Sequence, residues 1–247
     1  MNEKKIDRRK HYFLVVDIET ANTIEQPLAY DIGFAVADRK GNIYASYSYM
    51  VAEMFKEYSD LMETAYYAEK LPQYWRDYGM GLRQMRTIYF IRKKMLEVME
   101  AYGIHDVFAY NCYFDSHGLD NTLRYLTKSK TRWFFPYETE FHCIQHCACQ
   151  TILKQKAYFR FALENNLVTA NGNLSTTAES AYRYITHDTD FAESHTGLED
   201  VRIEAQILAK CFRQHKKMNT SINRGAWNLP QKDFKNFKKT LDNLTQM

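Results

Sequence analysis

The sequence predicts an α/β fold in which helices flank a mixed β-sheet. Three extended segments, 11–20, 30–37 and 43–51, open the chain of 247 residues, and their apolar or alternating patterns are typical of strands. A mainly helical segment over 52–101 follows, and the short apolar run 106–110 then predicts a further strand. Strands first, then a helical crossover and another strand, indicate a sheet with both antiparallel and parallel pairs.

The first three strands are predicted to run antiparallel to one another. The strand over 11–20 is mainly apolar until it reaches Asp17 and Glu19, near its end. The turn at 38–42 contains Gly41, which can adopt positive φ, so the second and third strands should form a hairpin. The third strand alternates with period two, as a strand with one buried face does.

The rest of the chain is predicted to be mainly helical. Pro72 and the glycine-containing stretch 79–81 divide the segment 52–101 into two helical parts. The aromatic run 133–135, closed by Pro136, predicts a fifth strand. Apolar residues at helical spacing predict further helices, over 119–126, 141–165, 178–186, 198–212 and 233–244.

Composition and charge favour a soluble protein of the cytoplasm. Five cysteines without a signal peptide are typical of a reducing compartment, and no apolar run reaches the roughly 18 residues that a membrane span needs. The net charge is only +3, but the chain from Arg213 onward carries eight basic and two acidic residues. This part is predicted to be a linker over 219–230 and a basic amphipathic helix. We expect the helix to pack its phenylalanine face on the domain, with docking of a nucleic acid or protein as the alternative.

Asp17 and Glu19 are the first candidates for a functional site. Side chains two residues apart on a strand point to the same face, so both carboxylates can enter one cavity. Buried carboxylates without a counter-charge are costly, and divalent cations prefer oxygen ligands. The pattern therefore predicts a metal site at the end of the first strand.

Three further residues are candidates for the same site, because the predicted elements place them near the end of the first strand. Asp115 comes a few residues after the strand 106–110, at the sheet edge where α/β proteins bind ligands. His195 and Asp200 lie at the start of the helix 198–212, five residues apart, so both can approach one cavity. Each has an ordinary alternative when taken singly, such as a helix N-cap for Asp115 and a solvated loop residue for His195.

In combination, these residues resemble the DEDDh family of 3′–5′ exonucleases, which are DnaQ-like members of the ribonuclease H-like superfamily. The segment 17–20 is similar to the family's Asp-x-Glu-Thr motif, and 30–36 resembles its second strand. The segment 111–115, Asn-Cys-Tyr-Phe-Asp, is similar to Asn-x-x-Phe-Asp, and 195–200 to His-x-x-x-x-Asp. The resemblance covers about residues 10–212 and leaves a phage-type member of the family open.

The resemblance implies a ribonuclease H-like fold with a mixed five-stranded sheet flanked by helices. It also implies hydrolysis of single-stranded nucleic acid to nucleoside 5′-monophosphates, with two Mg²⁺ or Mn²⁺ ions in the site. Asp17 would bridge the ions, Glu19 and Asp200 would hold the ion that activates water, and Asp115 would hold the other. His195 would act as general base, because a histidine titrates near pH 6.5.

Substrate and partners are less closely defined by the resemblance. Thr20 and Asn111 are expected to position the terminal nucleotide. DNA is slightly favoured as the substrate. The alternative is a ribonuclease that trims RNA 3′ ends, which stays open because no sequence feature indicates whether a 2′-hydroxyl is recognised. A non-catalytic nucleic-acid or polymerase-associated module is a further alternative, which the five filled catalytic positions oppose. Family members are often dimers, which leaves a homodimer or a replication-protein partner open.

The resemblance also suggests how the chain is divided. Residues 1–215 would form the exonuclease domain, with a helical insertion at about 52–104 that exceeds a minimal family member. Residues 216–247 would form the basic linker and the C-terminal amphipathic helix outside it.

Overall fold

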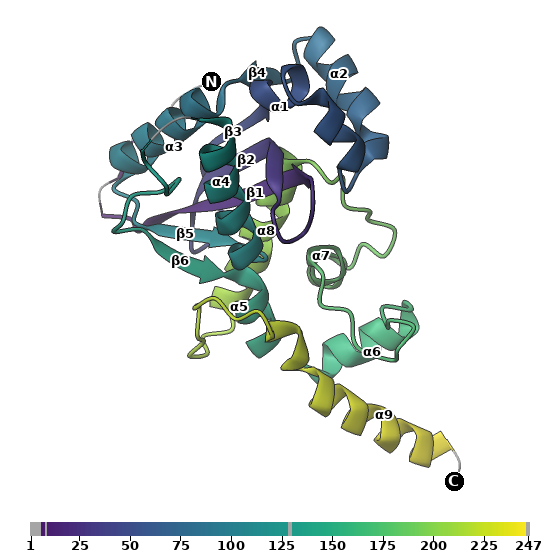
Figure 1. The fold of residues 1–247 in the computed structure, drawn as a ribbon. Coiled ribbons are helices and arrows are strands. Elements are labelled where there is room, and N and C mark those ends of the chain that lie inside the picture. Colours follow the sequence, from purple (N-terminus) through teal and green to yellow (C-terminus); the bar gives the residue numbers. More distant parts are fainter. Residues whose placement is uncertain (1–5, 8, 128–129, 246–247) are drawn as a thin grey trace.

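The computed structural model describes residues 6–7, 9–127 and 130–245. These residues form a mixed sheet of six strands in the order β4-β3-β2-β1-β5-β6, with helices on both faces (Figure 1). The strands are β1 (Tyr12–Ala21), β2 (Leu28–Asp38), β3 (Ile43–Val51), β4 (Gln84–Arg86), β5 (Asp106–Ala109) and β6 (Glu140–Cys143). The predicted α/β class is confirmed, and the sheet has one strand more than predicted.

The antiparallel start of the sheet agrees with the prediction. β1 pairs antiparallel with β2, with Asp17 opposite Gly33, and β2 pairs antiparallel with β3. On its other side β1 pairs with β5, which runs parallel to it with Leu14 opposite Val107, and β6 runs parallel to β5. β1 is therefore an interior strand, paired on both sides, and its end lies inside the molecule.

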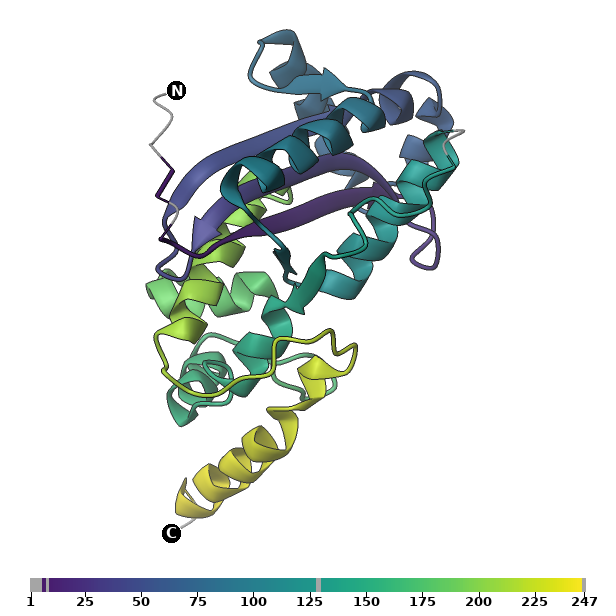
Figure 2. The ribbon, with the colours of Figure 1, turned by 90° about the vertical axis from the view of Figure 1, so that its left-hand side faces the viewer.

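Helices and short 3-10 turns connect the strands and cover the sheet. They are α1 (Ala52–Lys56), η1 (Ser59–Thr64), η2 (Ala68–Lys70), α2 (Leu71–Gly79), α3 (Ile88–Tyr102), α4 (Cys112–Leu126), α5 (Ile144–Gln150), α6 (Lys156–Glu164), α7 (Ala178–Thr186), α8 (Gly197–Phe212), η3 (Ala226–Asn228) and α9 (Gln231–Thr245). α3 and α4 lie on one face of the sheet and α8 on the other (Figures 1 and 2). None of the helices that the structure describes combines the length and apolar character needed to cross a membrane.

Two apolar cores lie on the two faces of the sheet. Leu14 and Val16 of β1 belong to the core beneath α3 and α4, whereas Phe13 and Val15 belong to the core beneath α8. This alternation follows from the strand pleat, in which successive side chains point to opposite faces. Odd-numbered residues at the end of β1 therefore point toward α8.

Two predicted elements between residues 130 and 165 are wrong. Residues 133–135 lie in a loop, where Phe134 and Phe135 are buried and the Phe134 N–H donates to Asp120 Oδ1 at 2.7 Å. The aromatic run therefore signalled burial and not strand pairing. The strand of this region is β6, which includes the first three residues of the segment 141–165 that was predicted to be helical. With four residues, β6 is too short to show the alternating pattern of a strand. The remainder of that segment is divided between α5 and α6.

The segment 52–104 is mainly helical, as predicted, but it also contributes an edge strand. β4 runs parallel to β3, with Met85 opposite Met50, in a stretch that was expected to be helical. Three residues are too few to show the alternation of a strand.

Pro72 lies in the first turn of α2, where it begins the helix and does not divide it.

The C-terminal part of the chain packs on the rest of the molecule. The segment 219–230, which was expected to be a linker, is hydrogen-bonded to β6, since the Thr220 carbonyl accepts from the Cys143 N–H at 2.7 Å. In α9, Phe234 is fully buried against Phe159 of α6, with ring centroids 5.5 Å apart. The expected packing of the phenylalanine face is confirmed, although α9 points away from the sheet in both views (Figures 1 and 2).

α8 meets the sheet backbone to backbone at two glycines. A Cβ atom on Gly33 of β2 would lie 1.9 Å from the carbonyl oxygen of Gly197, at the start of α8. A Cβ on Gly197 would lie 2.6 Å from the Gly33 nitrogen. Because both obstacles are backbone atoms, no side-chain rotation can relieve the clash. Glycine at these positions thus lets the first turn of α8 rest directly on β2, beside Asp17 of β1.

We predict that Gly33→Ala lowers the free energy of unfolding by about 1–3 kcal/mol or more, because the added methyl group must push α8 away from the sheet. Urea denaturation measures the change. Gly79→Ala is the matched control: its Cβ would meet nothing within 4 Å, and alanine favours the helix in which Gly79 lies. Equal stability of Gly33→Ala and wild type would contradict the prediction.

Candidate active site

The residues that the sequence motifs single out all line one cavity of about 500 Å³ at the end of β1. They are Asp17, Glu19, Thr20, Asn111, Asp115, His195 and Asp200. Three places in the chain supply them, namely the end of β1, the start of α4 and the loop that leads into α8. The fold therefore gathers residues that lie far apart in the sequence into a single concave site.

β1 delivers two carboxylates to this cavity. Asp17 and Glu19 share the face of the strand that points toward α8, and the pairing of β1 with β2 shifts register directly after Glu19. Burial, and after it the charge of Asp200, raise the pKa of Glu19 to about 9. Burial also raises the pKa of Asp17 well above its ordinary value, with Glu204 as the neighbouring acid that contributes most.

α4 supplies Asp115 from its first turn, with Asn111 as the residue that precedes the helix. The Asp115 side chain is buried, and burial raises its pKa to about 7. Hydrogen bonds from the backbone amides of Asp115 itself and of Ile18 oppose this rise. The carboxylate thus lies at the junction between α4 and the end of β1.

The start of α8 supplies Asp200, and the loop before it supplies His195. The Thr196 N–H donates to Asp200 Oδ2 at 2.9 Å, which fixes the carboxylate at the first turn of the helix. His195 adopts a left-handed conformation with φ of 53°, and its ring stacks on Tyr67 with centroids 3.8 Å apart. Burial lowers the pKa of His195 and the charge of Lys70 adds to the effect, while the charges of Glu179 and Glu69 oppose it.

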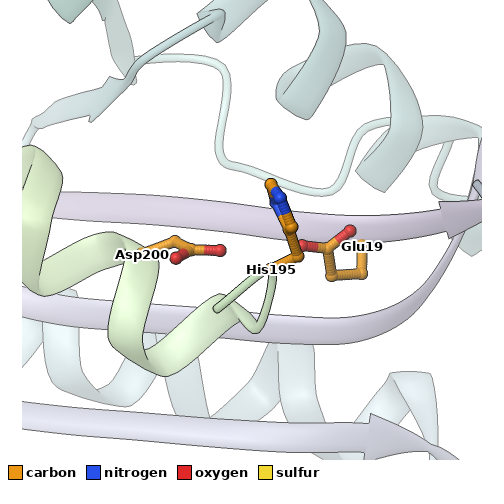
Figure 3. Close-up of side chains that lie close together, drawn as sticks. All are labelled: Glu19, His195 and Asp200. Atoms are coloured by element: carbon orange, nitrogen blue, oxygen red, sulfur yellow. The ribbon is translucent and has the colours of Figure 1, made fainter. Parts of the chain in front are cut away.

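Glu19, His195 and Asp200 form the tightest group in the cavity. Each offers a ligand atom such that all three atoms lie within 4.8 Å of one another. In Figure 3, the carboxylates of Glu19 and Asp200 point toward each other, and His195 lies between the two side chains in this view. Asp17 and Asp115 line the same cavity but do not belong to this group.

The cavity gathers carboxylates without cationic side chains beside them, and its donor set fits divalent cations. Glu193 and Glu204 bring the lining carboxylates to six, and no lysine or arginine is among the described residues that line it. Three oxygens, Asp17 Oδ2, Asp200 Oδ1 and Glu204 Oε2, have no hydrogen-bond partner within the described part of the chain although they are buried. Such oxygens are costly unless a cation meets them, and Mg²⁺ and Mn²⁺ bind carboxylate oxygens well.

Four lining residues with evident chemistry were missed by sequence reasoning: Glu193, Glu204, Tyr66 and Tyr67. Glu204 could have been found, because it follows Asp200 by four residues on the same helix and so shares its face. Tyr66 and Tyr67 lie between η1 and η2, where no period in the sequence points toward the cavity. They belong to the segment 52–104, which lies outside the motifs.

A buried aspartate of β2 connects the segment 52–104 to the start of α8. Asp31 is fully buried, and its carboxylate accepts from the Gly197 N–H at 3.1 Å and from Tyr74 Oη at 2.7 Å. Arg83 Nη1 lies 3.3 Å from the same carboxylate, and Ser48 donates to it at 3.2 Å. Burial raises the pKa of Asp31, while Arg83 and these hydrogen bonds oppose the rise. Asp31 therefore fixes the helix start that carries Asp200.

No protein-family model and no curated protein matches the chain by sequence. Among solved structures it is similar to the nuclease domain of 3′hExo, a DEDDh family member, bound to rAMP, with a TM-score of 0.51, 14% identity and coverage of 87% of this chain and 99% of that one. It is also similar to E. coli exonuclease I in complex with a dA16 oligonucleotide, with a TM-score of 0.48, 12% identity and coverage of 81% of this chain and 41% of that one. The first likeness shows that the chain has the fold of a DEDDh nuclease domain, so the ribonuclease H-like class is confirmed.

We predict that Arg83→Met destabilises the protein by about 3–5 kcal/mol, because it leaves the buried Asp31 carboxylate without its counter-charge. The double variant Asp31→Asn with Arg83→Met should lose less than the sum of the two single variants, since the buried charge of Asp31 is removed together with its partner. Urea denaturation of the four proteins gives the coupling free energy. Strict additivity would contradict an interaction between Asp31 and Arg83.

We predict that the metal-free protein loses stability as pH rises from about 6 to about 8. The folded pKa values of Asp115, Asp200 and Glu19, about 7, 8 and 9, lie above the ordinary values of these acids near 4. The folded state therefore binds more protons than the unfolded state in this range, and raising the pH favours unfolding.

Thermal melting in EDTA and in Mn²⁺ tests this dependence. Mn²⁺ should raise the melting temperature at about pH 8 and weaken its dependence on pH, because a bound cation favours the ionised carboxylates. The variant Glu19→Gln should reduce the dependence in EDTA, which separates the effect of the cavity from that of histidines elsewhere. A melting temperature that does not change with pH in EDTA would contradict the prediction.

Proposed function

We propose that the chain is a metal-dependent 3′–5′ exonuclease that hydrolyses single-stranded nucleic acid to nucleoside 5′-monophosphates. One observation carries the proposal: in a fold of the DEDDh nuclease type, the four motif acids and His195 line a single cavity whose buried carboxylate oxygens lack partners. A purely structural role would require cationic or hydroxyl partners for these oxygens. The cavity offers no lysine or arginine among its described lining residues.

Asp17, Glu19, Asp115 and Asp200 are proposed to hold two Mg²⁺ or Mn²⁺ ions. Such ions supply a nucleophile at neutral pH and stabilise the negative charge that develops on the phosphate during in-line displacement. Regular secondary structure holds these ligands in fixed positions, as a metal site requires. Asp17 and Glu19 lie on an interior strand, and Asp115 and Asp200 lie in first turns of helices.

His195 is proposed to be the general base of the reaction. A nitrogen of its ring would accept a proton from the attacking water as the water oxygen forms a bond to phosphorus. The bond between phosphorus and the 3′ oxygen of the penultimate nucleotide would break, and that oxygen would take a proton from solvent water. Stacking on Tyr67 restricts the plane of the His195 ring, and the ligand atoms of Glu19 and Asp200 lie within 4.8 Å of its own. The lowered pKa of His195 keeps it able to accept the proton at neutral pH.

The proposed substrate is a single-stranded 3′ end. Thr20 and Asn111 line the cavity and are proposed to hold the terminal nucleotide. Tyr66, which is 72% exposed, and Tyr67 offer aromatic faces on which unpaired bases can stack without regard to sequence. DNA is the slightly preferred substrate of the proposal. RNA is the second candidate, favoured by the rAMP that is bound to the similar nuclease domain.

We predict that the wild type shortens 5′-labelled single-stranded DNA or RNA from the 3′ end in Mg²⁺ or Mn²⁺ and not in EDTA. Asp17→Asn should lower the rate by about a hundredfold or more, because it removes one of the charges that hold the ions. Denaturing gels of matched DNA and RNA oligonucleotides measure the ladder, and the faster substrate decides between them.

Asp60→Asn is the matched control for this assay, since Asp60 is exposed in η1 and outside the cavity. It should degrade both substrates as fast as wild type does. A folded wild type that cleaves neither substrate with either metal would refute the proposed activity and favour the non-catalytic module. An Asp17→Asn variant as fast as wild type would refute the assignment of the site.

A further inference from the structure

Glu204 is a buried acid for which the proposed reaction has no role. It follows Asp200 by four residues on α8, so it lies on the same side of the helix one turn further along. Its side chain is only 3% exposed, and it lines the same cavity as Asp17 and Asp115. The sequence motifs end at Asp200 and do not include it.

One oxygen of the Glu204 carboxylate has no polar partner. Oε2 is buried and makes no hydrogen bond within the described part of the chain, while a backbone hydrogen bond from Tyr110 lowers the pKa of the group against the effect of burial. A buried charged oxygen without a partner is costly, so a merely structural glutamate should face an arginine, a lysine or a hydroxyl. Glu204 Oε2 instead shares the cavity with the equally unpartnered Asp17 Oδ2 and Asp200 Oδ1.

We propose that Glu204 is a fifth carboxylate of the metal site and that its Oε2 helps to hold the divalent cations. The inference rests on the proposed function, because the cations are those of the proposed nuclease. Four carboxylates balance the charge of two divalent ions, and Glu204 adds one negative charge to that balance. The site therefore attracts cations more strongly than a site with four carboxylates would.

Calorimetric titration of Mn²⁺ into the full chain tests the role of Glu204. Glu204→Gln, which keeps the shape and removes the charge, should weaken the affinity for Mn²⁺ about tenfold or more. Asp200→Asn should weaken it as well. Glu53→Gln is the matched control and should bind Mn²⁺ as wild type does, because Glu53 lies outside the cavity and accepts from the Ile88 N–H at the start of α3.

Thermal melting in EDTA separates the loss of a ligand from the loss of the fold. Without metal, Glu204→Gln replaces a buried acid that has no counter-charge by a neutral side chain of the same shape, so this variant should melt at the same temperature as wild type or higher. A variant that binds Mn²⁺ weakly and also melts below wild type in EDTA would assign Glu204 a structural role and overturn the inference.

The binding data also distinguish failure of this inference from failure of the proposed function. If Glu204→Gln binds Mn²⁺ within twofold of wild type while Asp200→Asn loses binding, the role of Glu204 is overturned and the metal site stands. If wild type binds no Mn²⁺, both proposals are overturned. If wild type binds Mn²⁺ and Glu204→Gln does not, but wild type degrades no nucleic acid, the nuclease proposal alone is overturned and Glu204 remains a metal-site residue.

Discussion

The arrangement of the site depends on the direct contact between the backbones of β2 and α8. Because Gly33 and Gly197 carry no side chains, the first turn of α8 lies against the sheet and brings Asp200 to the end of β1. Asp31 acts at the same point, since its buried carboxylate accepts from the Gly197 N–H. The close packing of the two glycines and the hydrogen bond to Asp31 therefore both fix the position of the first turn of α8. Displacement of this start would separate Asp200 from Glu19, whose positions come from different parts of the chain.

Bringing six carboxylates together raises the energy of the metal-free fold, and the surrounding structure must offset this cost. Asp17 and Glu19 lie at the end of an interior strand with an apolar core on each face, and Asp115, Asp200 and Glu204 lie on helices that pack on the sheet. Such a frame allows little relaxation, so the carboxylates cannot move apart to reduce their repulsion. Part of the free energy of cation binding would then be relief of this repulsion. The packing that holds the carboxylates in place thus also strengthens the binding of cations.

The sequence was most informative where a pattern has a direct physical meaning. Because side chains two residues apart on a strand share a face, Asp17 and Glu19 were expected to enter one cavity, and both line it. The motifs identified three segments that line the same cavity. It failed where the signal was ambiguous or too short. The aromatic run 133–135 is buried in a loop, and the edge strands β4 and β6 are three and four residues long. Tyr67 could not be predicted at all, because only the tertiary structure brings it to His195.

The segment 52–104 is therefore part of the site and not an addition to it. It provides Tyr74 and Arg83 to the buried Asp31, and it provides the ring on which His195 stacks. Its backbone also joins the edge of the cavity, since the Tyr66 N–H donates to the Thr20 carbonyl at 3.2 Å. A chain without this segment would keep every motif residue, yet it would lose the counter-charge of Asp31 and the stacking partner of His195. The geometry of the proposed reaction thus depends on residues that no motif contains.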